Sequence, residues 1–77
     1  MTVLLFGAAR DLAGADSLTL PDLATVGAVR AALRDACPPL AGLVARSQLA
    51  VNLQIEPDPA PVPSGAEVAL IPPVSGG

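Results

Sequence analysis

The residues best suited to chemistry stand at the end of the chain, which closes with the letters IPPVSGG. Pro72-Pro73 favour an extended backbone, Val74-Ser75 follow, and Gly76-Gly77 carry no side chain at all. The group that such an end presents most openly is the α-carboxylate of Gly77. Chemistry at this carboxylate, held on a stiff spacer, is therefore the first function to consider.

The rest of the chain lacks the side chains on which most enzymes depend. It contains no His, Lys, Tyr or Trp, so the usual general base near neutral pH and a Schiff-base amine are both missing. Cys37 is the one thiol, too few for a zinc site built from several Cys or His ligands. We therefore expect no independent enzyme, no bound metal and no cofactor held by the chain itself.

Charge and cysteine content restrict the partners and the compartment. Four arginines against seven acidic residues give a net charge of −3, which argues against nucleic acid and anionic membrane surfaces. The single cysteine excludes an internal disulfide and is typical of a reducing compartment. The N-terminal apolar run is short and its first cation, Arg10, follows it, unlike a signal peptide. We expect a cytoplasmic protein that binds other proteins or neutral to cationic molecules.

Two strands are expected near the N-terminus. The segment TVLLFG favours a strand ended by Gly7, and SLTLP alternates polar and apolar residues from Ser17 to Leu20. The intervening AARDLAGAD is interpreted as a connection, with Gly14 and Asp16 as turn formers. The two strands are expected to pair as a hairpin with a long loop.

A helix is expected next, because the apolar residues now recur at helical spacing. Thr25 suits the N-cap position, and Pro38-Pro39 must end the helix by Cys37. The residues of its apolar stripe are Val26, Val29, Ala32, Leu33 and Ala36.

The second half of the chain is expected to hold a short helical turn over LAGLVARS, then strands from Leu49 to Ile55 and from Glu67 to Ile71. Four prolines in EPDPAPVPS indicate a stiff loop or a ragged edge, because proline donates no ladder hydrogen bond. This order of elements predicts one α+β domain, a mixed sheet with one main helix packed on one face.

Alternation along the strands predicts which face of the sheet the helix covers. The polar residues Thr2 and Glu67 share a side with Phe6 and Ile71, so that side is expected to stay open. Phe6 and Ile71 would then form part of a protein interface or lie beneath loops. The residues expected under the helix are Val3, Leu5, Val68 and Leu70.

Four segments, in order and over the full length, resemble the small, sulfur-carrying subunit of molybdopterin synthase. They are FGAARDLAG, TVGAVRAAL, AVN and GAEVALIPPVSGG. The terminal ALIPPVSGG is the most specific, because a diglycine end alone fits several ubiquitin-like proteins. The resemblance implies a ubiquitin-like β-grasp domain over residues 1–72 and a flexible diglycine tail over residues 73–77.

The resemblance implies chemistry at Gly77. A free α-carboxyl group has a pKa of roughly 3.3–3.7, so it is ionised at neutral pH and can attack the α-phosphate of ATP. Sulfur then displaces AMP and leaves a thiocarboxylate, which supplies the dithiolene of molybdopterin. The implied partners are an adenylyltransferase similar to the ubiquitin-activating enzyme, which uses the ATP, and a large catalytic subunit that binds the cyclic pyranopterin precursor, in a heterotetramer.

The resemblance also implies roles for single residues. Gly76 and Gly77 enter the partners' active sites, where the absence of a Cβ lets the backbone pass a narrow channel. Two positions depart from the family pattern, since Ala66 replaces an acid and Leu53 a glutamine. The residues that the resemblance assigns to partner binding are Phe6, Arg10, Ile55, Ile71, Pro72, Pro73, Val74 and Ser75.

Other interpretations stay open. The thiamine-pathway sulfur carrier shares the fold and the diglycine end, although its tail generally lacks the Pro-Pro-Val-Ser context. A ubiquitin-like modifier would join its carboxyl end to lysines of other proteins, and an inert β-grasp adaptor would make no use of the tail. Arg10 could be a solvated surface residue, and Cys37 is interpreted as a packing residue rather than a persulfide site.

Overall fold

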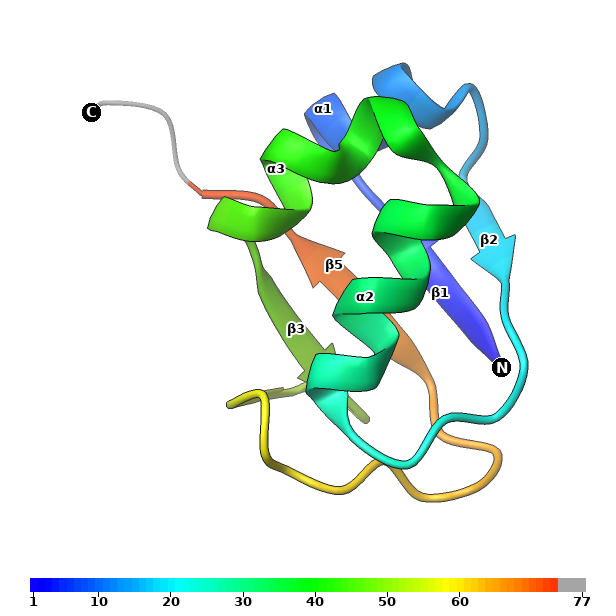
Figure 1. The fold of residues 1–77 in the computed structure, drawn as a ribbon, viewed down its shortest axis with the longest axis vertical. Helices are drawn as coiled ribbons and strands as arrows, with labels where there is room; N and C mark the ends of the chain where they lie inside the picture. The colour runs from blue at the N-terminus through cyan, green and yellow to red at the C-terminus, as the bar shows by residue number, and fades with distance from the viewer. Residues whose placement is uncertain (74–77) are drawn as a thin grey trace.

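The fold is a five-stranded mixed sheet with helices, given by a computed structural model that describes residues 1–73 (Figure 1). The strands lie in the order β2-β1-β5-β3-β4, and α2 crosses one face of the sheet. The predicted α+β architecture is confirmed. The elements are β1 (Thr2–Leu5), α1 (Gly7–Ala13), β2 (Ser17–Thr19), α2 (Val26–Ala36), the 3₁₀ helix η1 (Pro38–Leu40), α3 (Ala41–Arg46), β3 (Gln48–Val51), β4 (Gln54–Glu56) and β5 (Val68–Ile71).

The first and last strands are neighbours in the middle of the sheet. β1 pairs with β5 in parallel, with Val3 opposite Val68 and Leu5 opposite Leu70. β2 pairs antiparallel with β1, as predicted, and β3 pairs antiparallel with the other side of β5. Parallel neighbours need a long crossover connection, and the segment that contains α2 supplies it.

The helix side of the sheet is the predicted one. The apolar stripe of α2 is buried at Val26, Val29 and Leu33. The short helical turn predicted over residues 40–47 is confirmed as α3, which adds Leu43 and Val44 to the core. As a separate matter, the helices described in residues 1–73 all lack the length and apolar composition of a membrane-spanning segment. The four strand residues predicted to lie under the helix, Val3, Leu5, Val68 and Leu70, are all buried.

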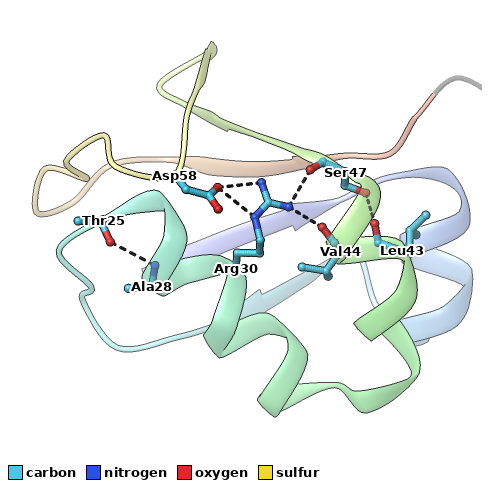
Figure 2. Close-up of polar contacts among 7 residues, drawn as sticks. All are labelled: Thr25, Ala28, Arg30, Leu43, Val44, Ser47 and Asp58. Carbon is cyan, nitrogen blue, oxygen red and sulfur yellow. Dashed lines mark hydrogen bonds and ion pairs between the residues drawn. The ribbon is translucent and has the colours of Figure 1, made fainter.

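The start of α2 is held by acceptors from outside the helix. The Thr25 Oγ1 atom accepts from the Ala28 amide at 3.2 Å, which confirms the predicted N-cap (Figure 2). The main-chain carbonyls of Ala60 and Asp58 accept from the first two amides of the helix at 3.0 and 2.9 Å. The proline-rich loop, predicted to be stiff or ragged, thus satisfies helix donors that have no partner within the helix.

Arg30 ties α2 to two other segments (Figure 2). Its guanidinium donates to the main-chain carbonyls of Val44 and Ser47 at the end of α3, the latter at 2.8 Å. Two of its nitrogens, Nε and Nη2, lie 3.0 Å from Asp58 Oδ1 in the proline-rich loop. Because the Arg30 side chain is only 17% exposed, these contacts replace the water that the guanidinium lost on folding.

A helix occupies the segment that was predicted to be an irregular connection. α1 spans Gly7–Ala13, and its C-cap Gly14 lies in the left-handed region at φ 69°. The turn role of Gly14 is confirmed, but the prediction of a connection over residues 8–16 is wrong. The helix has seven residues and buries only Ala9, so its apolar periodicity is too short to recognise in the sequence.

The prediction of one strand from Leu49 to Ile55 is also wrong, because two strands occupy this segment. β3 and β4 are joined by the two-residue turn Asn52-Leu53. Both turn residues have positive φ, 50° and 70°, as a type I′ hairpin loop requires. The turn escaped prediction because it lacks the glycine that usually marks such a loop.

The contacts of Arg30 make a prediction about stability. Arg30→Met removes the donors but keeps the aliphatic stem, and it should lower the free energy of unfolding by about 1–3 kcal/mol, because partly buried acceptors lose their partners. Arg34→Met is the matched control on the same helix, where the side chain is exposed, and it should cost about 0.5 kcal/mol. Urea denaturation followed by circular dichroism measures both, and equal losses would contradict the role of Arg30.

Candidate functional site

The tail begins where β5 leaves the sheet. Ile71, the last residue of β5, pairs with Gln48 on β3 and is half-buried. Pro72 is half-buried and Pro73 is exposed. The structure therefore places the base of the predicted site at the end of a central strand. The predictions for the remaining site residues, Val74, Ser75, Gly76 and Gly77, fall outside the described residues.

Apolar side chains line the sheet face opposite α2. Phe6 continues the alternation of β1, because its backbone is extended at φ −130° and ψ 156°, and its neighbour Leu5 points into the core. Phe6 is 49% exposed and Ile55 is 47% exposed, so loops do not cover them. The strand register aligns Leu4, Ala69, Ala50 and Ile55 in one row across this face.

We call Phe6, Leu4, Ala69, Ile55 and Ile71 the open-face patch. Three of its members, Phe6, Ile55 and Ile71, were predicted as a docking surface, and the structure brings them to one face of the sheet. Phe6 follows Leu5, which pairs with Leu70, so Phe6 stands next to Ile71 where the tail begins. The patch and the start of the tail are therefore adjacent.

Arg10 lies at the edge of this region, on α1. Its amide donates to the Phe6 carbonyl at 3.4 Å, which fixes its main chain one helical turn from the patch. Its Nε atom lies 3.8 Å from Asp16 Oδ1, and both side chains are exposed, so water screens this ion pair and it adds little to stability. The Arg10 side chain is thus accessible to a partner that approaches the patch.

Two further features lie outside the open-face patch: a hollow on the same side of the sheet and the thiol of Cys37. An open hollow of about 330 Å³ lies at the far end of the open face, between the N-terminus and the start of β5. Sequence reasoning missed it, because it forms between segments distant in the chain. Cys37 is half-buried and packs against the core, in agreement with its predicted packing role. The residues that line the hollow are Met1, Thr2, Leu4, Gly65, Ala66 and Glu67.

A family model decides the relationship of the chain. The model of the ThiS family matches residues 3–77, nearly the whole sequence. The chain belongs to the ThiS family. It is accordingly a small sulfur carrier or ubiquitin-like modifier.

Solved structures support the same assignment of the fold. SAMP1 from Haloferax volcanii is 28% identical, with a TM-score of 0.85, and the match covers 99% of this chain and 97% of that chain. The small archaeal modifier protein 1 from Methanosarcina acetivorans is 24% identical with a TM-score of 0.84, covering 99% and 94% of the two chains. A chain from the complex of subunits 1 and 2 of the molybdopterin-converting factor from Helicobacter pylori is 22% identical with a TM-score of 0.71, covering 99% and 96%. The fold of this ThiS-family protein is the ubiquitin-like β-grasp.

The division of the sheet into a covered and an open face predicts opposite outcomes for two neighbouring residues. Leu5→Ala should lower the free energy of unfolding by about 2–5 kcal/mol, because Leu5 is 2% exposed and its removal leaves a cavity. Phe6→Ala should cost only about 1 kcal/mol, because half of the ring already contacts water. Urea denaturation of the two variants checks this, and an equal or larger loss for Phe6→Ala would show that Phe6 belongs to the core.

Proposed function

We propose that this chain is the sulfur-carrier subunit of molybdopterin synthase. In this role Gly77 is adenylated, converted to a thiocarboxylate and used to deliver sulfur to cyclic pyranopterin monophosphate. The observation that carries the proposal is the place where β5 ends, since its last residue, Ile71, belongs to the open-face patch and the PPVSGG sequence follows directly. Membership of the ThiS family and the fold shared with a chain of the molybdopterin-converting factor complex support it.

A partner that docks on the open-face patch would lie next to the base of the tail. The six residues from Pro72 to Gly77 reach at most roughly 20 Å, which is enough to enter an active-site cleft in that partner. Pro72-Pro73 restrict the backbone before binding, so less conformational entropy is lost when the tail enters. Gly76-Gly77 add no side chain that the cleft would have to accommodate.

The chemistry takes place in two transfers. First, a carboxylate oxygen of Gly77 attacks the α-phosphate of ATP and pyrophosphate leaves. A sulfur nucleophile then attacks the acyl carbon and expels AMP, which leaves the thiocarboxylate. In the second transfer the sulfur moves to the pterin precursor, and water restores the carboxylate. The chain contributes the acyl group, while an adenylyltransferase binds the ATP and the large subunit of the heterotetramer binds the pterin.

A second candidate is a protein modifier, which the 28% identity to SAMP1 over almost the whole chain favours. A modifier would start from the same acyl-adenylate and join the Gly77 carbonyl to a lysine amine of another protein. This chain has no lysine, so it could not form lysine-linked chains with itself. A third, the thiamine-pathway carrier, would give the same thiocarboxylate to thiazole synthase instead.

Loading of sulfur on Gly77 is measurable as a change in intact mass. Incubation with ATP, the activating enzyme and a sulfide source should raise the mass by about 16 Da, because one sulfur replaces one oxygen. Omission of ATP should prevent the gain, since the carboxylate is then not activated.

The tail itself supplies the matched controls. Deletion of Gly77, or addition of one residue after it, should abolish the mass gain while the circular dichroism spectrum of the domain stays unchanged. A gain in either variant would contradict the tail mechanism. Adducts with lysines of other proteins, in place of the mass gain, would identify the modifier.

A further inference from the structure

The tip of the β3–β4 hairpin carries a leucine in a conformation that leucine seldom adopts. Leu53 has a φ of 70°, in the left-handed region that branched and bulky side chains avoid. Its side chain is 91% exposed, the most exposed of the large hydrophobic residues described. A single exposed leucine is ordinary on a protein surface. Leu53 differs because the exposure coincides with an unfavourable backbone.

The surrounding contacts hold the turn in place. The Asn52 amide donates to the Glu67 carbonyl at 2.8 Å, and the Glu67 amide donates back to Asn52 Oδ1 at 3.0 Å. Val51 and Gln54, the last pair of the β3–β4 ladder, flank the turn directly. Leu53 is therefore presented on a tip that is tied to the start of β5, and little of its position has to be fixed on binding.

The position of the hairpin continues the open-face patch. β4 is the edge strand of the sheet, and β3, its antiparallel partner, lies between β4 and β5. Ile55, a member of the patch, follows Leu53 by two residues on β4. A partner that covers the patch as far as Ile55 would thus reach the hairpin tip.

We propose that Leu53 is an anchor that inserts into an apolar pocket of the large synthase subunit. The inference rests on the proposed function and extends its docking surface from Ile55 to the end of the hairpin. Leu53 buries almost none of its apolar surface within this fold and stands in a strained backbone. The favourable free energy of burying this side chain would therefore be gained only in a complex with the partner.

One acidic residue near the tip, Glu67, would face the rim of that pocket. Glu67 touches the turn through its main chain and is exposed, whereas Glu56 pairs with the buried Leu49 and lies on the helix side of the sheet. The Glu67 carboxylate forms no ion pair within the described part of the chain. A second copy of this chain would bring like charges together, whereas a pocket with Arg or Lys at its rim would complement this carboxylate.

The test uses the full-length chain and the purified large subunit, with binding measured by isothermal titration calorimetry. Leu53→Asn removes the apolar group and suits positive φ better, so it should weaken binding about tenfold to hundredfold while the Tm is unchanged or higher. Leu53→Met keeps an apolar side chain and should bind within about threefold of the original chain. Leu12→Asn is the matched control, a 50% exposed leucine on α1, and should not alter binding.

The outcomes separate this inference from the proposed function. Unchanged affinity of Leu53→Asn, with tight binding of the original chain, would overturn the anchor and leave the proposed function standing. No binding of the original chain to the large subunit would instead count against the proposed function. Dimers of the original chain that Leu53→Asn abolishes, seen by sedimentation at the same concentration, would assign Leu53 to self-association and also overturn the anchor.

Discussion

The parallel pairing of β1 with β5 is the constraint on which the rest of the structure depends. It places the first and last strands of the chain side by side at the centre of the sheet, with Val3 against Val68 and Leu5 against Leu70. The intervening residues must cross from one to the other, and α2 covers one face as they do so. The same pairing brings Phe6 next to Ile71, so the open-face patch and the start of the tail become neighbours.

A second constraint is the difference between the two faces of the sheet. The helix side contains most of the core, whereas the open side keeps Phe6 and Ile55 about half exposed. In a chain of 77 residues the core is small, and polar contacts at its border supplement it. Arg30 is the main example, since one guanidinium connects α2, the end of α3 and the proline-rich loop. Because these contacts lie on the helix side, the open face is left free for a partner.

Much of this arrangement could be predicted from the sequence, and the failures have physical reasons. The α2 stripe and its Thr25 cap follow from helical spacing and a hydroxyl in the right place, and strand alternation correctly assigned Leu5 and Phe6 to opposite faces. α1 was missed because a helix of seven residues with one buried alanine shows too little helical periodicity of apolar residues to be recognised. The hairpin was missed because Leu53 occupies a position where glycine is usual.

The candidate site could likewise be predicted from the sequence only in part. The proposed chemistry of Gly77 depends on residue type and chain position, which can be read directly from the sequence. The common face of Phe6, Ile55 and Ile71 depends on register between strands that are far apart in the chain, and alternation alone could suggest it for Phe6 and Ile71 only. The hollow at Met1 and Glu67 and the exposed, positive-φ conformation of Leu53 could be recognised only in the three-dimensional structure.

The proposed role of this ThiS-family domain is the delivery of sulfur from Gly77 to a pterin in the active site of a docked large subunit. The most direct measurement mixes the thiocarboxylate form of the chain with the large subunit and cyclic pyranopterin monophosphate and follows its intact mass. A loss of about 16 Da is expected as sulfur is exchanged for oxygen, with no loss in the presence of thiazole synthase and its substrates. A thiocarboxylate that persists with the large subunit but is consumed by thiazole synthase would contradict it.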